Sequence, residues 1–389
     1  MSLKKIILLV TFLPALAVAQ LSKQFPMVPG VPIVHSPKSS GKYIGTPSIV
    51  KMPGGDFIAS HDFFGPSCKS DIVHVYRSSD KGKNWHFLSE VDDTFWAGLF
   101  NINDTLYLLG VKGSNRNLAI RKSYDEGKTW TQASILKEGH YHGSSTPVVF
   151  AGGRVYKGYD HLGKDTGKRW MSGNRSFVMS APVASDLTDP DNWLYSDEIV
   201  KPASMDGTGW LETNAVMGPD GKIKGITRVA NESGLIAGYY SLINDTTVDI
   251  TSIGTINFLG GATKFNIRWD EKTKRYWSLA NYPPDVLRKP KMRAGGMRSV
   301  LALISSENLK DWKLNAIILA SDNVTYHGFQ YVDWLFDGED IIVACRTGYE
   351  DGMGGSDNAH NSNYMTFHRI KNYKSAKTPK KFRYLLENK

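Results

Sequence analysis

Cysteine is nearly absent from this chain of 389 residues, which contains only Cys68 and Cys345, far apart in the sequence. Two cysteines exclude a disulfide-stapled scaffold and are too few for a typical zinc cluster. Whether they pair stays open, because a bond between them requires a fold that brings both ends of the chain together. No ligand spacing predicts a metal or another cofactor, although histidine and cysteine ligands meeting inside the fold would still allow a structural metal ion.

Long apolar runs are also missing, except for one near the N-terminus. Lys4 and Lys5 precede an apolar run at residues 6–16, which is followed by Ala-Val-Ala at 17–19. The run is too short to cross a bilayer and is followed by the small residues of a cleavage site, so residues 1–19 are predicted to be a signal peptide cleaved near Ala19. We expect a secreted or periplasmic protein without a membrane span, consisting of one catalytic domain at residues 20–389 and acting as a monomer.

Acidic residues are fewer than basic ones, 38 against 47, which gives a formal net charge of +9. Removing Lys4 and Lys5 with the signal peptide leaves 9 − 2 = +7. An exported protein with this excess of cations is expected to attract a polyanion, and an acidic polysaccharide or oligosaccharide is the natural extracellular candidate. The alternative is a merely basic surface. A nucleic-acid partner is not expected, because no dense basic run or known binding module accompanies the charge.

The sequence contains no convincing amphipathic helix; instead, short strand-like runs alternate with Gly, Asp and Asn turns. Regular strands without helices predict an all-β sandwich, barrel or propeller, and repetition decides among them. A similar hairpin recurs about every 50 to 65 residues, as expected for one four-stranded propeller blade per repeat. The hairpins lie at residues 46–65, 96–111, 142–161, 212–230, 262–282 and 328–348.

Most hairpins are followed by a turn that ends in Trp. Two of these turns, SSDKGKNW at 78–85 and SYDEGKTW at 123–130, resemble the Asp box of sialidase-like propellers, and degenerate forms occur at 184–193 and 305–312. Such turns support the fold and say little about the reaction. Six blades are clear. A seventh is predicted from residues 364–368 closing against residues 31–35, so the fold is a six- or seven-bladed β-propeller, with seven favoured.

Polar residues gather at one end of the hairpins. In the hairpin at 142–161, a turn at Gly152 and Gly153 returns the chain, so His142 and His161 are expected at the same end. Reading the other hairpins in the same way gives one functional rim. The residues assigned to it are His61, Asp62, His142, His161, Glu212, Asn214, Arg228, Lys264, Asn281, Tyr326, His327, Gln330, Arg346 and His360.

Histidines, tyrosines and fixed cations at one rim suit β-elimination at a uronic acid. Cations stabilise the negative charge that builds on the C6 carboxylate as the C5 proton leaves, and a neutral histidine is able to take that proton. We expect Arg228, Lys264 and Arg346 to be the cations; ordinary ion pairs with neighbouring acids are the alternative for all three. Hydrolysis by the usual route needs a pair of carboxylates, and no pair stands out among Glu212, Asp62 and Asp160.

Several segments resemble propeller enzymes that act on rhamnose–glucuronate linkages, namely the propeller-type ulvan lyases and a related rhamnosidase-like glycoside hydrolase family. The segments are IASHDFFG, YHGSSTPVV, WLETNAVMGPDGKI, GGATKF, HGFQYVDWLFDGEDII and AHNSNYMTFHRI. The resemblance implies a secreted seven-bladed propeller in which His142, His161 and Arg228 form the lyase set. The lyase tyrosine aligns near residues 212–213, where this chain has none, so Tyr141, Tyr159 or Tyr240 would replace it. His61 matches the histidine of the rhamnosidase-like relatives.

The predicted function is therefore degradation of an uronic-acid-containing glycan by elimination, either as a lyase or as a dehydratase that eliminates water. The catalytic candidates are His142, His161, Arg228, Tyr159 and His61, and the substrate-binding candidates are Lys264, His327, Arg346, His360, Asn214 and Glu212. Exo-acting hydrolysis, rhamnosidase-like or sialidase-like, is the alternative, and a non-catalytic glycan-binding propeller is another. The absence of an early Arg-Ile-Pro motif argues against a true sialidase.

Overall fold

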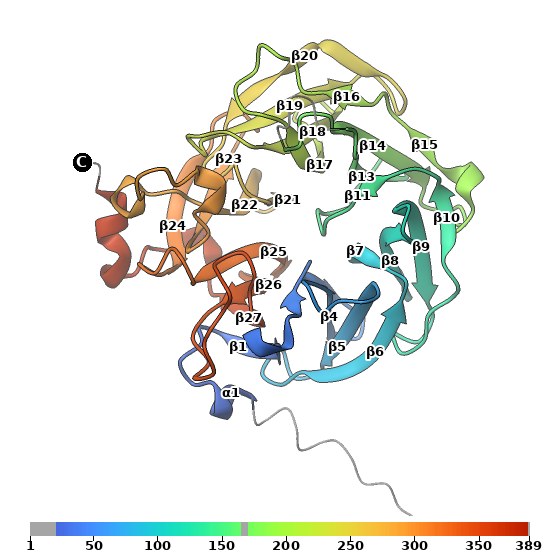
Figure 1. Cartoon of the computed structure of the whole chain (residues 1–389). Helices are drawn as coiled ribbons and strands as arrows, with labels where there is room; N and C mark the ends of the chain where they lie inside the picture. Colours follow the sequence, from blue (N-terminus) through green and yellow to red (C-terminus); the bar gives the residue numbers. More distant parts are fainter. Residues whose placement is uncertain (1–20, 165–169, 388–389) are drawn as a thin grey trace, which may run out of the picture.

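The computed structural model describes residues 21–164 and 170–387, and the predicted signal peptide at 1–19 lies outside these residues. Six antiparallel sheets are arranged around a central axis as the blades of a propeller (Figure 1). In the part of the chain that is described, no helix is long and apolar enough to cross a membrane. The sequence thus predicted the all-β propeller correctly.

Blades 1 to 5 are each built from strands that follow one another in the sequence, and the first of these strands lies nearest the axis (Figure 1). Blade 1 contains β2 (Tyr43–Ile44), β3 (Ser48–Lys51), β4 (Phe57–Phe64), β5 (Ile72–Ser78) and β6 (His86–Asp92). Blade 2 contains β7 (Phe95–Ile102), β8 (Thr105–Lys112), β9 (Asn117–Ser123) and β10 (Ser134–Lys137). Blade 3 contains β11 (Tyr141–His142), β12 (Val149–Ala151), β13 (Arg154–His161), β14 (Arg175–Pro182), β15 (Leu194–Tyr195) and β16 (Ile199–Val200).

The second half of the chain repeats this plan. Blade 4 contains β17 (Trp210–Met217), β18 (Ile223–Val229), β19 (Ile236–Leu242) and β20 (Val248–Asn257). Blade 5 contains β21 (Asn266–Asp270), β22 (Arg275–Asn281), β23 (Val300–Ser306) and β24 (Lys313–Ala320). Blade 6 contains β25 (Gly328–Asp337), β26 (Asp340–Gly348), β27 (Tyr364–Ile370) and β1 (Val31–His35). The helices in the described residues are α1 (Leu21–Gln24) and the short 3₁₀ turns Lys38–Ser40, Pro190–Asn192, Asp285–Leu287, Ala294–Gly296, Tyr373–Ser375 and Lys380–Leu386.

The expected seventh blade was wrong. Strand β1 does pair with β27, with Val31 opposite Phe367, but the two strands complete blade 6 instead of forming a blade of their own. The reason is that β25 and β26 supply only the inner half of the sixth sheet, and β27 and the N-terminal strand supply its outer half. The pairing of the N-terminal strand with β27 closes the ring of blades. Cys68 and Cys345 are both free thiols.

The hydrophobic core is divided among the interfaces between blades. Six clusters of buried side chains each combine residues from two neighbouring blades, and together they go once around the ring. This explains the near-continuous apolar strands such as β23, in which all seven residues are buried, because a blade is covered on both faces. The aromatic side chains of two predicted turns belong to this packing: Trp85 lies in the cluster between blades 6 and 1, and Trp130 packs against the cluster between blades 1 and 2.

Those two turns share a set of hydrogen bonds. The Ser78 hydroxyl donates to Asp80 at 2.9 Å and accepts from the backbone N–H of Gly82 at 2.9 Å. At the second turn, the Ser123 hydroxyl donates to Asp125 at 2.8 Å and accepts from Gly127 N–H at 2.8 Å. The carboxylates thus fix the turn backbone and leave the following Trp at the blade interface.

Candidate active site

A cavity of about 460 Å³ lies at the end of the axis where the six inner strands begin, which is the rim predicted to carry the function. We call it the arginine cavity. Its walls come from loops and strand ends of five blades and combine aromatic, basic and histidine side chains with a single carboxylate. Among the residues lining it are Asp62, Phe64, Trp96, His142, Trp170, Leu211, Tyr331, Arg346 and His360.

Three inner strands carry a β-bulge at this end, and each bulge holds a non-glycine residue with positive φ. The residues are Trp96 with φ +47°, Glu212 with φ +64° and Tyr331 with φ +50°. A positive φ costs a side chain of this kind about 1–3 kcal/mol and is found where a bulge re-aims a residue toward a site. The strand ends therefore hold these three side chains in orientations that a regular strand would not give.

Carboxylates of the preceding blades hold two of these bulges in place. Asp62, on β4 of blade 1, accepts from the backbone N–H of Trp96 at 2.6 Å and of Thr46 at 2.5 Å. Asp160, on β13 of blade 3, accepts from the N–H of Glu212 at 2.5 Å and from the hydroxyl of Thr213 at 2.8 Å. Burial raises the pKa of Asp160 to about 7 and raises that of Asp62 as well.

Three buried arginines surround Tyr331, which lines the cavity. Arg228 on β18, Arg298 just before β23 and Arg346 on β26 are only 3%, 6% and 3% exposed. Arg228 forms an ion pair with Glu212 at 3.0 Å. Within residues 21–164 and 170–387, no carboxylate forms an ion pair with either of the other two arginines. Arg298 instead donates to the side-chain oxygen of Gln330, and Arg346 donates from Nε to the carbonyl of His360 at 3.1 Å.

The arginines influence one another and a tyrosine between them. Burial lowers the pKa of both Arg298 and Arg346 to about 10, so both remain protonated at neutral pH. Burial opposes the charge of Arg228, but Glu212 and Tyr331 together outweigh it and raise the pKa of Arg228. The guanidinium carbons of Arg298 and Arg346 lie 5.7 and 4.7 Å from the centre of the Tyr331 ring. The result is a concentrated positive charge around one phenol.

Tyr331 and Glu212 form a pair inside this charge. Arg228 Nη1 bridges them, donating to the carboxylate of Glu212 at 3.0 Å and to the hydroxyl of Tyr331 at 3.4 Å. Burial opposes ionisation of Glu212, yet Arg228, His142 and a hydrogen bond with Tyr331 lower its pKa. Burial and the charge of Glu212 raise the pKa of Tyr331. At neutral pH the pair is therefore a neutral phenol beside a carboxylate.

Two histidines complete the cavity. His142 packs on Trp96 with ring centres 4.1 Å apart, and its Nδ1 is buried with no hydrogen-bond partner among the described residues. Burial lowers the pKa of His142 to about 4. His360 packs edge-on against Phe64, and burial together with Arg346 lowers its pKa to about 2. Both imidazoles are therefore neutral at physiological pH.

The structure brings five of the predicted residues together: His142, Glu212, Arg228, Arg346 and His360. The hairpin at 142–161 has the predicted form, with His142 opposite Asp160 and Tyr141 opposite His161. However, the pairing directs His161 away from the cavity, where its Nδ1 meets Glu198 at 2.8 Å.

Three other predicted residues, Tyr159, His61 and His327, lie outside the arginine cavity and contact other parts of the fold. Tyr159 is buried in the core cluster between blades 2 and 3. His61 is fully buried, stacked on Tyr76 and bonded to the carbonyl of Asp62 at 2.8 Å. His327 lies against Tyr349 and bonds to Ser321 at 2.7 Å.

Lys264 and Asn214 lie deeper in the molecule and connect blades. Lys264 Nζ donates to the carbonyl of Val332 at 2.6 Å, and burial lowers its pKa to about 8. Asn214 donates to the carbonyl of Phe265 at 3.1 Å and accepts from Ile267 N–H at 3.1 Å. Both side chains are thus used to hold blades 4, 5 and 6 against one another.

Sequence reasoning missed Tyr331 and Arg298. Tyr331 had a usable signal, because aligning QYVD at 330–333 with LETN at 211–214 places it level with Glu212. Arg298 had none, since it lies outside the inner hairpins in a loop before a third strand. No group of three or more His, Cys, Asp or Glu side chains in the described residues is placed to hold a metal ion.

No protein-family model matches this chain, and no curated protein matches it in sequence. Among solved structures it is similar to the α-L-arabinanase of Penicillium chrysogenum in complex with arabinobiose, at 15% identity and a TM-score of 0.58, covering 90% of this chain and 99% of that one. A mutant α-L-arabinofuranosidase of Fusarium graminearum with an iminosugar inhibitor gives 12% identity and a TM-score of 0.57, covering 88% and 97%. The sialidase of Trypanosoma rangeli in complex with sialic acid gives 15% and 0.54, covering 87% and 54%. At these identities the likeness shows the propeller fold alone.

Proposed function

We propose that this protein is a glycoside hydrolase that acts on a sugar bearing a carboxylate, with Tyr331 as nucleophile and Glu212 as the base that activates it. The observation that carries the proposal is the convergence of three buried arginines on the Tyr331–Glu212 pair. The similar solved structures include enzymes named for arabinan, arabinofuranoside and sialic acid, which supports a carbohydrate substrate.

The charge balance of the cavity favours an anionic ligand. Three cations, Arg228, Arg298 and Arg346, face two acids that influence their pKa values, Glu212 and Asp62. The balance is 3 − 2 = +1 when both acids are ionised, and more positive when Asp62 is protonated. Burying a charge without a partner costs free energy, and an anionic ligand bound in the cavity would supply the missing counter-charge. Arginine also binds a carboxylate through two parallel hydrogen bonds.

A phenol is well suited to attack such a substrate. An anionic nucleophile would be repelled by the bound carboxylate, whereas Tyr331 stays neutral until its proton leaves. In the proposed step the Tyr331 oxygen bonds to the anomeric carbon, the glycosidic C–O bond breaks, and the phenolic proton passes to Glu212. Water then attacks the anomeric carbon and breaks its bond to Tyr331; the proton of the water passes to the group that protonated the leaving oxygen, and Glu212 returns the phenolic proton to Tyr331. Tyrosine nucleophiles are an established exception to the usual carboxylate pair of glycosidases.

The departing oxygen needs a proton, and Asp62 is our candidate donor. It is the one carboxyl group among the described residues that line the arginine cavity, and burial raises its pKa, as a general acid requires. Both of its oxygens accept backbone N–H groups, so transfer of the proton requires one of these bonds to lengthen as the leaving group departs.

A second function, β-elimination at a uronic acid, is favoured by one specific observation. His142 is neutral, lines the same cavity and has an unpartnered Nδ1. In this route His142 removes the C5 proton, the arginines stabilise the charge on the carboxylate, and Tyr331 donates a proton to the leaving oxygen. The same groups would serve loss of water from a glucuronate-ended oligosaccharide. The predicted exported location suits either reaction on an extracellular glycan.

One experiment separates the two routes. The protein is incubated with umbelliferyl glycosides of sialic acid, glucuronic acid and rhamnose, and with ulvan and its glucuronate-ended oligosaccharides, while fluorescence and absorbance near 235 nm are recorded. Hydrolysis predicts release of the aglycone or a reducing sugar with flat absorbance. Elimination predicts a rise at 235 nm, and mass spectrometry then tells chain cleavage from loss of water.

Matched variants assign the chemistry. Tyr331→Phe should abolish hydrolysis, while Tyr326→Phe, on an exposed tyrosine of the same region, should leave it intact. His142→Ala should abolish elimination and leave a Tyr331-dependent hydrolysis measurable. Turnover that survives Tyr331→Phe and His142→Ala alike would refute both routes.

A further inference from the structure

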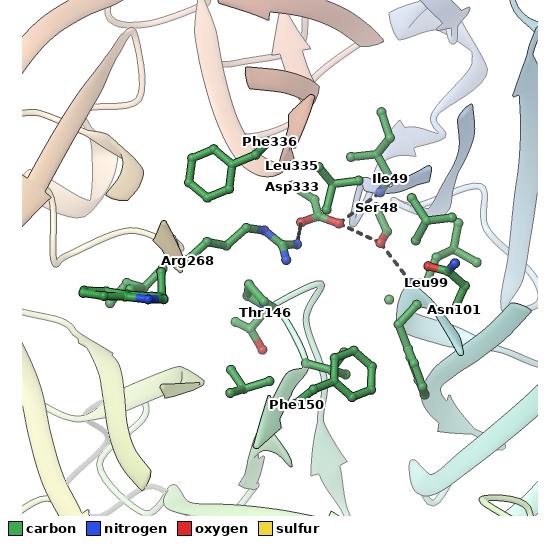
Figure 2. Close-up of a pocket in the computed structure, with 18 of the residues that line it drawn as sticks. Ser48, Ile49, Leu99, Asn101, Thr146, Phe150, Arg268, Asp333, Leu335 and Phe336 are labelled. Carbon is green, nitrogen blue, oxygen red and sulfur yellow. Dashed lines mark hydrogen bonds and ion pairs between the residues drawn. The ribbon is translucent and has the colours of Figure 1, made fainter. Parts of the chain in front are cut away.

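A second cavity of about 460 Å³ lies at the opposite end of the axis, where the inner strands finish. Figure 2 shows it enclosed by segments from around the ring, with Arg268 reaching toward Asp333 near its centre. Between the two cavities, hydrogen bonds from blade 5 to blade 3 cross the axis: Asn266 donates to the carbonyl of Ser145 at 2.8 Å, and Lys264 donates to the same carbonyl at 3.3 Å. The second cavity is therefore a separate space from the arginine cavity.

Exposed aromatic rings stand at the mouth of this cavity. Phe150 on β12 and Trp269 on β21 are 51% and 36% exposed, although both are large apolar side chains, and Phe336 on β25 lines the same space. They belong to blades 3, 5 and 6, so the rings face the cavity from different sides. Exposed apolar groups gathered around a hollow mark a binding surface more often than scattered ones do.

The floor of the cavity is polar and incompletely satisfied. Asp333 is saturated: it accepts from the Ser48 hydroxyl, from Asn266, from Arg268 and from the backbone N–H groups of Ile49 and Trp334. The Arg268 guanidinium, which lies 5.7 Å from the centre of the Trp334 ring, has Asp333 as its only hydrogen-bond partner among the described residues, and its Nε is buried without an acceptor. Arg268 therefore has N–H groups available for oxygen atoms of a ligand. A ligand that accepts from them would offset the free-energy cost of burying a donor without a partner.

We propose that this cavity binds a sugar unit of a glycan chain, with its ring against Trp269 and Phe150 and its oxygens on Arg268. Aromatic walls with a few convergent polar groups are the usual make-up of a small-ligand site. A pyranose has apolar C–H faces for the rings and hydroxyl or carboxylate oxygens for the guanidinium. The identification of the ligand as a glycan rests on the proposed function; the site itself rests on the geometry.

The test is electrophoresis of the folded protein in native gels that contain either ulvan, an acidic glycan, or linear arabinan, a neutral one. Tyr331→Phe is the background, so that the glycan is not consumed. We expect retardation by at least one glycan, and we expect the added pair Phe150→Ala and Trp269→Ala to weaken the apparent affinity at least fivefold. Arg268→Gln should weaken it by a similar factor. Tyr124→Ala, on an aromatic residue that is 69% exposed elsewhere, is the matched control and should leave retardation unchanged.

A second background variant, Arg298→Met, is expected to weaken ligand binding in the arginine cavity. Binding in the second cavity is then measured separately. Retardation that persists in Arg298→Met and is lost on Phe150→Ala and Trp269→Ala supports the second site, even if no acidic glycoside is ever hydrolysed. Retardation that is lost in Arg298→Met and unaffected by the aromatic pair would overturn it. Absence of retardation by both glycans would overturn it too. Circular dichroism of each variant verifies the fold. If Arg268→Gln unfolds, the variant with Phe150→Ala and Trp269→Ala still tests the site, because both side chains are exposed.

Discussion

The roles of the arginines can be separated by stability, because Arg228 and Arg298 have different partners. Arg228 neutralises the Glu212 carboxylate, whose side chain is 0% exposed, whereas Arg298 forms no ion pair in the described residues. If Arg298 is kept to bind a ligand, the unliganded protein should not need it. We therefore predict that Arg228→Met destabilises the protein strongly and that Arg298→Met does not.

The magnitudes follow from the local chemistry. The pKa of Arg298 falls from 12.5 to about 10, and at about 1.4 kcal/mol per pKa unit the buried charge costs roughly 3 kcal/mol at pH 7. Arg298→Met removes this cost but leaves the side-chain oxygen of Gln330 without its donor, which costs about 1–3 kcal/mol. The free energy of unfolding should therefore stay the same or rise by up to about 2 kcal/mol. Arg228→Met leaves Glu212 buried and unpaired, at about 3–5 kcal/mol.

Urea unfolding at pH 7, followed by tryptophan fluorescence, measures both values. The ligand-binding side is measured as the KM for the best acidic glycoside, where loss of a charge-assisted hydrogen bond of about 1.5–3 kcal/mol predicts a rise of roughly tenfold to a hundredfold for Arg298→Met. A loss of stability in Arg298→Met as large as that in Arg228→Met would refute the reasoning, because it would make Arg298 a structural residue.

Three further predictions concern single groups. Asp62→Asn should slow glycosides with poor leaving groups far more than umbelliferyl glycosides, which need little protonation; equal slowing of both would remove Asp62 as the acid. Tyr331→Phe should lower kcat roughly 10³-fold or more, while a competitive acidic sugar still binds in a fluorescence titration. Lys157, whose pKa burial lowers to about 7, is neutral in the folded protein and charged in the unfolded one between about pH 7 and 10, so stability should rise with pH there by up to about 1.4 kcal/mol per unit. Lys157→Met should flatten that rise in urea unfolding, and an unchanged slope would contradict the assignment.

Most of the fold could be predicted from the sequence, because each blade repeats the same local pattern of strands and turns. Strand-like runs joined by short turns repeat in all six hairpins, and the pairing of residues 31–35 with the C-terminal strand was also predicted. The blade count was wrong for a physical reason. A blade needs four strands, and the last repeat has only three of its own, so the N-terminal strand completes it instead of adding a sheet.

The site was less accessible to sequence reasoning, because neighbouring residues on a strand point to opposite sides. His142 and His161 do share one end of a hairpin, yet only His142 lines the cavity. The bulges at Glu212 and Tyr331 change which side a residue faces, and a bulge is hard to see in a sequence. Arg298 reaches Tyr331 from a loop in a different blade, a contact that only the packing of blade 5 on blade 6 creates.

The central claim is that the Tyr331 oxygen attacks the substrate. The most direct test is to treat the protein with a fluorinated acidic glycoside that slows release of a covalent intermediate, and then to map the added mass by peptide mass spectrometry. The account predicts one adduct on Tyr331, lost in Tyr331→Phe and reduced in Glu212→Gln. An adduct on another side chain, or turnover of acidic glycosides that yields an unsaturated product with no adduct, would contradict it.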